Sequence, residues 1–274
     1  MSELFKAVLF GIVEGITEWL PISSTGHLIL LNEFVTLDMS EAFGSMFDVV
    51  IQLGAILAVI VLFFGKLNPF DLSKSIRQKK QTWDLWFKVI LAIIPSGVVG
   101  VLFDDWMDAH LHNGIVVSIA LIVYGIAFIL VERMNAGKKP SVKTVYQIDL
   151  KTALLIGAFQ CLSLIPGTSR SGSTILGAIL LGVGRGAGAE FSFFMAIPTM
   201  LGASAIKLLK FMMSGVTATG TEIMVLIVGC VVSFLVSMVV IKALMEYVRR
   251  HSFSAFGVYR IILGAVVLAY FIMN

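Results

Sequence analysis

Two apolar stretches of this sequence are interrupted near their middle by residues that break helices, and this feature restricts the fold most. The stretches cover residues 4–36 and 152–184, and the segments LPISSTGH at 20–27 and PGTSRSG at 166–172 interrupt them. Each half is too short to cross a bilayer, since a spanning helix needs roughly 20 apolar residues. Non-helical backbone at membrane depth is tolerated only where protein buries it or where it lines a wet cavity. The pattern therefore predicts two re-entrant helix-loop-helix hairpins.

Six further apolar stretches have no such interruption and are long enough to span a membrane. Only 14% of the residues are charged, against about 25% in soluble domains. The sequence therefore predicts an all-α polytopic membrane protein that forms a single domain over residues 1–274. No cleavable signal is expected, because the first apolar stretch contains glutamates and lacks a small-residue cleavage site. The predicted spans are residues 44–64, 86–105, 114–132, 189–213, 222–243 and 254–273.

Basic residues gather in three of the predicted loops. When six spans and two hairpins are threaded in order, all three loops lie on one side of the membrane, which the positive-inside rule makes cytoplasmic. Both termini and an acidic loop with Asp104, Asp105 and Asp108 are then expected outside. The net charge of +3 is too small and too dispersed to predict a nucleic-acid partner. The basic residues are Lys66, Lys74, Arg77, Lys79, Lys80 and Lys88; Arg133, Lys138, Lys139, Lys143 and Lys151; and Lys242, Arg249 and Arg250.

The two interrupted stretches resemble each other, which indicates a duplication. GIVEGIT at 11–17 matches GAFQCLS at 157–163, and in each stretch a proline precedes a serine by three positions, Pro21 with Ser24 and Pro166 with Ser169. The predicted halves are residues 1–135 and 150–274, each with one hairpin and three spans. An odd number of crossings would invert the second half. Inverted repeats with broken helices place their polar site near the midplane, where the copies meet.

Glu14 and Glu18 share one helix face, because they are four positions apart. Two carboxylates among apolar residues are costly unless a proton or a cation lies between them. A hard divalent cation, Mg²⁺ or Ca²⁺, suits such oxygen ligands, so both residues are predicted metal ligands. The alternative is that this helix end reaches water.

Hydroxyl groups and one imidazole follow directly in the first interruption, at Ser23, Ser24, Thr25 and His27. A hydroxyl near an imidazole or carboxylate is the minimal arrangement of an activated nucleophile, and histidine transfers protons at neutral pH. Ser24, His27 and Glu18 are therefore candidate catalytic residues, and Ser23 and Thr25 candidate substrate-binding residues. Such residues are also common in turns and helix caps, which is the structural alternative.

The second interruption supplies positive charge through Arg170. The arginine lies among Ser169, Ser171 and Thr174, where a helix is predicted to begin. A helix N-terminus attracts anions, and an arginine fork binds phosphate oxygens in pairs. The segment predicts a phosphate cradle, with Arg170 also counted as catalytic. The alternative is a structural ion pair between Arg170 and a glutamate of the first hairpin, which is compatible with a phosphate site.

Other polar residues in apolar segments are weaker candidates. Gln160 and Glu190 are possible partners of the site, although Glu190 also suits a membrane edge near Arg185. Arg260 is expected to extend toward the cytoplasmic surface, as arginines near helix ends do. Three histidines are expected in solvated loops: His110, His112 and His251.

The motifs EGITEWLPISSTGH at 14–27 and PGTSRSGST at 166–174 closely resemble the two signatures of the bacterial undecaprenyl-diphosphatase family, also called the bacitracin-resistance proteins. The resemblance covers the whole chain, including FDVVIQLG at 47–54 and EFSF at 190–193. It implies a bacterial inner-membrane phosphatase with an outward-facing site and a divalent cation. Its substrate would be the C55 isoprenyl diphosphate lipid, from which it regenerates the monophosphate carrier for cell-wall synthesis. Bacitracin would compete by sequestering that lipid, and a homodimer is left open.

Carried onto this chain, the resemblance implies that Glu14 and Glu18 serve metal or base chemistry. It assigns attack and proton transfer to Ser24 and His27 and diphosphate binding to Arg170. The residues alone leave the nucleophile open between Ser24, His27 and water. They also leave open a carrier for an anion or phospholipid, because inverted repeats with a midplane charge cluster are typical of transporters. A nucleophile with adjacent bases favours hydrolysis, since a carrier has no use for it.

Overall fold

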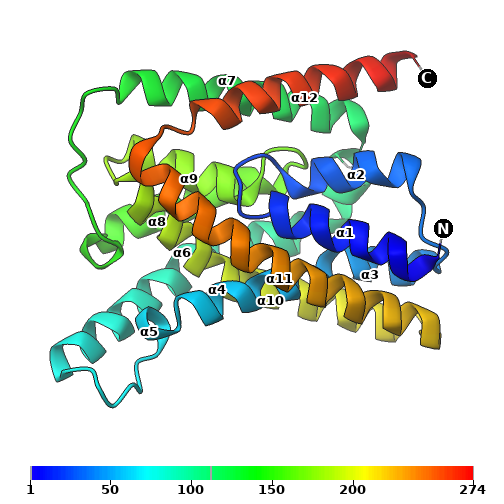
Figure 1. The fold of residues 1–274 in the computed structure, drawn as a ribbon, viewed down its shortest axis with the longest axis horizontal. Helices are drawn as coiled ribbons and strands as arrows, with labels where there is room; N and C mark the ends of the chain where they lie inside the picture. Colours follow the sequence, from blue (N-terminus) through cyan, green and yellow to red (C-terminus); the bar gives the residue numbers. More distant parts are fainter. Residues whose placement is uncertain (1, 112, 274) are drawn as a thin grey trace.

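A computed structural model describes residues 2–111 and 113–273, and within them the chain is a helical bundle with no β-strand (Figure 1). The prediction of six membrane-spanning stretches is confirmed by length and hydropathy, since six helical segments are long and apolar enough to cross a bilayer. The second is longer than expected, because its helix begins in the basic loop. The segments are α3 (Glu41–Val50) with α4 (Gln52–Leu62), α6 (Ile76–Leu111), α7 (Gly114–Met134), α10 (Arg185–Met213), α11 (Gly220–Arg250) and α12 (Ser254–Met273).

Each interrupted stretch forms two short helices that fold back on each other. The first gives α1 (Glu3–Thr17) and α2 (Ser24–Phe34), and the second gives α8 (Leu150–Cys161), a 3-10 turn η2 (Leu162–Leu164) and α9 (Arg170–Leu180). Figure 1 shows both hairpins turning inside the bundle rather than crossing it. The re-entrant placement in a bilayer and the inverted repeat stay predictions. The short elements α5 (Phe64–Leu67) and η1 (Val145–Gln147) complete the fold.

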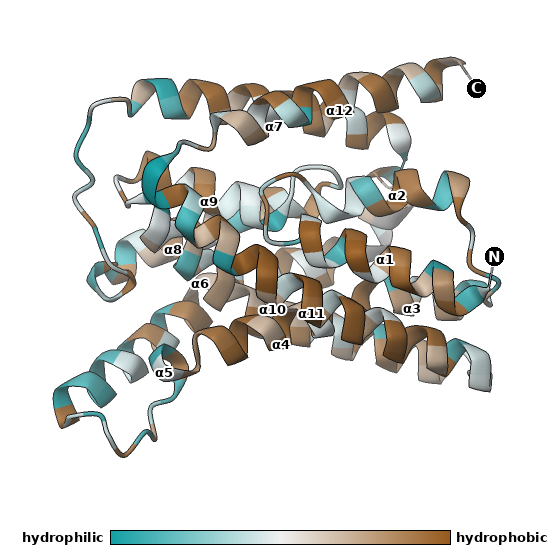
Figure 2. Cartoon of the chain, viewed as in Figure 1, coloured by the Kyte–Doolittle hydropathy of each residue, from teal (hydrophilic) through white to brown (hydrophobic). Residues whose placement is uncertain are grey.

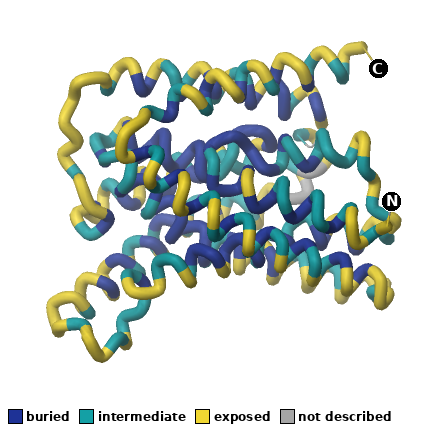
Figure 3. Tube along the Cα trace, viewed as in Figure 1, coloured by how far each residue is buried: buried dark blue, intermediate teal, exposed yellow. Residues whose placement is uncertain are grey.

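The helices are arranged in layers that enclose the hairpins. In Figure 1, α7 and α12 form the upper layer, α4 and α10 lie at the opposite side, and the hairpin helices lie between them, with α11 running obliquely across them toward the start of α12. The most extensive helix contacts are those of α12 with α7, of α1 with α11 and of α8 with α6. Figure 3 shows that buried positions concentrate in the middle layer. The polar residues of both turns are buried, among them Ser23, Ser24, Thr168 and Ser171, as non-helical backbone at membrane depth requires, whereas other parts of the hairpin helices are exposed.

Glycines allow two pairs of helices in the bundle to approach each other closely. A Cβ atom at Gly157 on α8 would lie 1.9 Å from the backbone oxygen of Ala92 on α6. One at Gly54 on α4 would lie 2.1 Å from the backbone oxygen of Cys230 on α11. Both distances are far below van der Waals contact, so these helices pack backbone to backbone.

The hydrophilic connections lie together at one end of the bundle, opposite to the two termini (Figures 1 and 2). This end holds the α5–α6 loop and the long connection from α7 to α8, which carry basic residues of the predicted cytoplasmic side. The predicted acidic loop is wrong, because Asp104, Asp105 and Asp108 belong to α6, which continues to Leu111. His110 is on the same helix rather than in a loop, His251 follows the end of α11, and His112 lies outside the described residues.

Candidate active site

The turns of the two hairpins have the same backbone geometry. Ser23 and Ser169 are the non-glycine residues of the described chain with positive φ, at 75° and 73°. Each is the N-cap of the helix that follows, with its hydroxyl accepting from Gly26 N at 3.2 Å or from Gly172 N at 3.1 Å. The equivalent serines are thus Ser23 and Ser169, not the Ser24 and Ser169 that the proline spacing suggested. A non-glycine residue held in this conformation costs about 1–3 kcal/mol, and such strain clusters at functional sites.

The Ser24 hydroxyl is hydrogen-bonded to a carboxylate. Ser24 is the first residue of α2, and its Oγ donates to Glu18 Oε2 at 2.7 Å. Glu18 is the C-cap of α1, and both residues are buried, with exposed fractions of 5% for Glu18 and 7% for Ser24. The hairpin turn therefore brings the candidate nucleophile Ser24 into contact with the candidate base Glu18, the geometry that hydroxyl activation needs.

Arg170 is placed against the same carboxylate from the other hairpin. As the first residue of α9, it donates from Nη2 to Glu18 Oε1 at 3.1 Å and from Nε at 3.3 Å. Its Nη1 donates to the Ser192 backbone oxygen on α10 at 2.8 Å, and its guanidinium lies 5.9 Å from the centroid of the buried Trp19 ring. The ion pair that was the alternative for Arg170 is present. It also places the guanidinium beside Ser24, because Glu18 contacts both.

Glu14 lies one helical turn before Glu18 and is fully buried. No described residue forms a hydrogen bond with either of its carboxylate oxygens. A buried carboxylate without partners is costly, so this position calls for a proton or a cation. Glu14 offers two unpartnered oxygens to a hard divalent cation, whereas both oxygens of Glu18 already accept hydrogen bonds from Ser24 and Arg170. Mg²⁺ commonly uses one or two carboxylates together with phosphate oxygens of the substrate. No three His, Cys, Asp or Glu side chains of the described chain form a larger cluster.

The imidazole of His27 contacts Ser23 and Tyr259 rather than Ser24. Its Nδ1 lies 2.7 Å from the Ser23 backbone oxygen, and its Nε2 lies 2.7 Å from the hydroxyl oxygen of Tyr259 on α12. Neither nitrogen contacts Ser24. Of the two candidate bases, Glu18 and not His27 is therefore the residue in contact with the Ser24 hydroxyl.

Several hydroxyls predicted to bind substrate are hydrogen-bonded within the protein. Ser171 Oγ donates to the backbone oxygen of Glu18 at 3.0 Å, which links α9 to the first hairpin. Thr174 Oγ1 donates to the Arg170 backbone oxygen at 2.9 Å and lies 2.6 Å from Ser192 Oγ. Thr25 is half-buried beside Ser24. These contacts order the site, and binding of substrate by these groups stays a prediction.

The expectation that Arg260 reaches the cytoplasmic surface is wrong. Arg260 on α12 has no exposed surface, and its guanidinium lies between the two hairpin turns. Nη1 donates to the Pro21 backbone oxygen at 3.1 Å and Nη2 to the Gly167 backbone oxygen at 2.7 Å. Backbone carbonyls freed by the helix breaks need donors, and this arginine supplies them. The guanidinium of Arg260 is therefore buried where it donates hydrogen bonds to the backbone carbonyls of both turns.

Sequence reasoning missed Ser192 and Tyr259 and assigned no role in the site to Arg260. The only available signal was Arg260 itself, an arginine inside the last apolar stretch.

Two residues that were possible partners of the site lie elsewhere. Gln160 does not reach the site, since its Nε2 donates to Ser96 Oγ at 2.6 Å. Glu190 pairs with Lys66 at 2.7 Å, whereas Arg185 pairs with Glu132.

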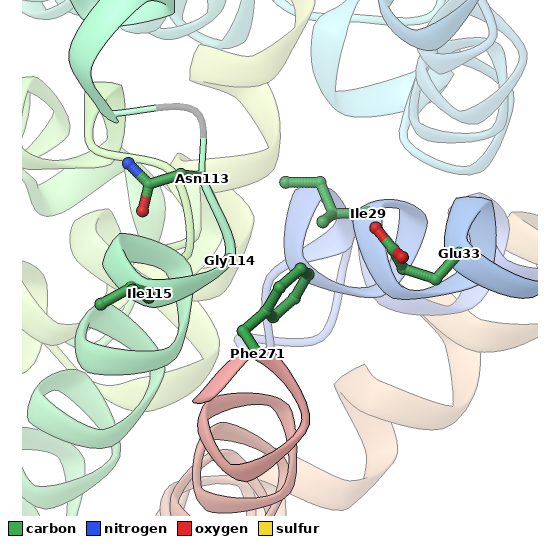
Figure 4. Close-up of a pocket in the computed structure, with 6 residues that line it drawn as sticks. All are labelled: Ile29, Glu33, Asn113, Gly114, Ile115 and Phe271. Atoms are coloured by element: carbon green, nitrogen blue, oxygen red, sulfur yellow. The ribbon is translucent and has the colours of Figure 1, made fainter. Parts of the chain in front are cut away.

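A pocket of about 450 Å³ opens near the termini, where α2 and the end of α12 meet the start of α7. Figure 4 shows its lining, which includes none of the candidate catalytic residues. The pocket is therefore separate from the buried charges of the site. It is lined by Ile29, Glu33, Asn113, Gly114, Ile115 and Phe271.

Comparison with known proteins finds similarity over nearly the whole chain. The family model described as bacitracin resistance protein BacA matches residues 7–266. Undecaprenyl-diphosphatase 1 of Clostridioides difficile is 62% identical over 273 residues, which cover 100% of this chain and 98% of that protein. The undecaprenyl-diphosphatase of Limosilactobacillus fermentum is 58% identical over 271 residues, which cover 99% of this chain and 98% of that protein. That of Enterococcus faecalis is 57% identical over 268 residues, covering 97% and 96%.

Proposed function

The chain belongs to the bacitracin resistance protein BacA family, and we propose on that premise that it is a membrane-embedded undecaprenyl-diphosphatase. It hydrolyses the C55 isoprenyl diphosphate to the monophosphate and inorganic phosphate, which recycles the carrier lipid for cell-wall synthesis and confers bacitracin resistance. The observation that carries the assignment to this site is the contact of Ser24 Oγ with Glu18 Oε2 at 2.7 Å, with Arg170 on the other oxygen of the same carboxylate.

Ser24 is the nucleophile in this mechanism. Its Oγ forms a bond to the terminal phosphorus while the bond from that phosphorus to the bridging oxygen breaks, and the lipid monophosphate leaves. The proton of the hydroxyl passes to Glu18, which already accepts its hydrogen bond. Water then cleaves the phosphoserine, which releases phosphate and returns the proton to Ser24. General-base help of this kind contributes about 10²–10⁴-fold in rate.

Arg170 binds the terminal phosphate in this mechanism. Its position beside Glu18 and at the start of α9 brings a guanidinium and a helix N-terminus to the oxygens on which charge accumulates. Ser169, Ser171 and Thr174 line the same helix start, and Ser23 and Thr25 flank Ser24 on the opposite hairpin. We assign these groups to the diphosphate.

Glu14 and Glu18 are the proposed ligands of a divalent cation, Mg²⁺ or Ca²⁺. The support is the buried carboxylate of Glu14, which has no hydrogen-bond partner within the described chain and lies one turn from Glu18. When bound, the cation would neutralise charge on the phosphate oxygens. We assign proton transfer in the hydrolytic half of the reaction to His27, whose Nδ1 is held by the Ser23 carbonyl and whose Nε2 lies against the Tyr259 hydroxyl.

A carrier for an anion or phospholipid is the rival function. Broken helices and buried charges are compatible with it. The Ser24–Glu18 contact favours hydrolysis, because binding alone does not require a hydroxyl in contact with a buried base.

The orientation in the membrane is part of the proposal. The basic connections lie at one end and both termini at the other (Figure 2), which with the positive-inside rule supports termini on the outer side of the bacterial inner membrane. We assign the active site to the same side. Bacitracin would then compete for the lipid on that side. A homodimer is compatible with the fold.

Phosphate release from a C55 prenyl diphosphate by the purified protein in detergent tests the function. We expect release that EDTA removes and that Ser24→Ala reduces by about 10³-fold or more, while Ser214→Ala, at an exposed helix end, behaves as wild type. Lipid binding by folded protein without any release would overturn the diphosphatase assignment in favour of transport.

A further inference from the structure

The two ring nitrogens of His27 have different partners, and these define its tautomer. Nδ1 lies 2.7 Å from the Ser23 backbone oxygen. A carbonyl oxygen only accepts hydrogen bonds, so Nδ1 carries the proton. In the neutral ring Nε2 then has the lone pair, and the Tyr259 hydroxyl at 2.7 Å is its donor. The geometry of these two contacts thus specifies the tautomer that leaves Nε2 basic.

The phenol is aligned with the imidazole rather than merely near it. The planes of the two rings differ by 1°, and their centroids are 5.7 Å apart. The two rings are thus parallel, and the hydroxyl oxygen of Tyr259 is within hydrogen-bond distance of Nε2.

The next residue on α12 fixes the position of Tyr259. Arg260 is bound to the Pro21 backbone oxygen at 3.1 Å and to the Gly167 backbone oxygen at 2.7 Å, and so holds α12 in register with both hairpin turns. Pro21 belongs to the same turn as Ser23, whose carbonyl holds the other side of the imidazole. The hydrogen-bond partners of both His27 nitrogens are therefore held in place: Ser23 by the first hairpin turn, and Tyr259 by the neighbouring Arg260 on α12.

We propose that Tyr259 is a positioning residue of the active site: its hydroxyl, donated to Nε2, holds His27 in one orientation as the Nδ1–H tautomer with a basic Nε2. This inference deepens the diphosphatase function proposed above and rests on it for the kinetic consequence. In catalytic triads the acceptor at Nδ1 sets the tautomer of the histidine, and the rate depends strongly on that tautomer. The Ser23 carbonyl takes this position here, and Tyr259 at Nε2 keeps the ring from rotating away from it.

Tyr259→Phe tests the proposal, because it removes one oxygen and keeps the ring. We expect kcat for the C55 prenyl diphosphate to fall about 10- to 100-fold, with KM changed less than about twofold. Tyr270→Phe, on the same helix three turns away, is the matched control and should keep wild-type kinetics.

The second measurement is ¹⁵N NMR of the protein labelled at histidine. The chain has 4 histidines, and His27→Asn identifies the signals of His27. In the wild type we expect the Nδ1–H tautomer at neutral pH, and in Tyr259→Phe signals that shift toward tautomer exchange.

The outcomes separate the inference from the function on which it rests. An Nε2–H tautomer in the wild type, or unchanged kcat and unchanged ¹⁵N signals in Tyr259→Phe, would overturn the role of Tyr259. An inactive wild-type protein with the expected tautomer would instead overturn the diphosphatase function and keep the hydrogen bond. A fall in kcat without any change in the His27 signals would also contradict the proposal, because the effect would not pass through His27.

Discussion

Ser24 Oγ donates a hydrogen bond of 2.7 Å to Glu18 Oε2 across the turn between α1 and α2. Glu18 ends one helix and Ser24 begins the next, so the unwound turn itself brings the carboxylate and the hydroxyl together. Arg170 reaches the other oxygen of Glu18 from the second hairpin. The three side chains therefore form one site only when both hairpins are folded, and the following variants test what each contributes.

Glu18→Gln should lower kcat by about 10²–10⁴-fold, because the amide keeps the shape of the side chain but does not take the Ser24 proton. The rate of phosphate release at a saturating concentration of the lipid diphosphate measures kcat. Glu190→Gln is the matched control, since Glu190 is paired with Lys66 away from the site. Equal activity of the Glu18→Gln and wild-type proteins would rule out Glu18 as the base.

Arg170→Lys should lower kcat/KM by about 100-fold, because an ammonium group does not reproduce the two parallel bonds of a guanidinium to phosphate oxygens. Lysine keeps the positive charge beside the buried Glu18, so the protein should still fold. Steady-state kinetics give the ratio, and Arg185→Lys, which preserves charge at the pair with Glu132, is the control. A variant with normal kcat/KM would contradict the assignment of Arg170 to the phosphate.

Glu14→Gln should raise the Mg²⁺ concentration for half-maximal activity by at least about tenfold, because one of two carboxylate ligands is lost. The assay titrates Mg²⁺ or Ca²⁺ into EDTA-treated protein. If the metal dependence stays the same and activity is retained, Glu14 is not a ligand, and its buried carboxyl is kept neutral by a proton instead.

Arg260→Met should destabilise the protein by about 3 kcal/mol, since the buried backbone oxygens of Pro21 and Gly167 would lose charged donors. Thermal unfolding in detergent should show a lower midpoint. Arg249→Met removes an exposed arginine and should leave the midpoint in place. A stable Arg260→Met variant would mean that water or other groups satisfy both turns.

Gly157→Ala should destabilise the protein by about 1–3 kcal/mol, because its Cβ would lie 1.9 Å from the Ala92 backbone oxygen and α8 would have to move from α6. Gly97→Ala is the control on α6, where no atom lies within 4 Å of an added Cβ. That variant should be neutral or slightly stabilising, as alanine is the better helix former. Equal unfolding midpoints for the two variants would contradict the close packing of α8 on α6.

Sequence alone determined the spans and the two interruptions. The mean hydropathy of a segment depends only on its own residues, so the six spans could be found without knowing which helices pack against them. Proline, glycine and serine break helices locally, which placed the turns before α2 and α9. The spacing of Glu14 and Glu18 on one helix face is likewise a local property.

Tertiary structure alone decided which of these groups contact each other. Arg170 and Glu18 are 152 positions apart, and Arg260 and Pro21 are 239 apart, so neither pairing is encoded in a local pattern. Arg260 could not be predicted for this reason: an arginine in an apolar helix extends to the surface by default, and only the carbonyls freed by two distant turns make its burial favourable. The sequence supplied the chemical groups, and the packing of both hairpins against α12 selected Glu18 for Ser24 and Tyr259 for His27.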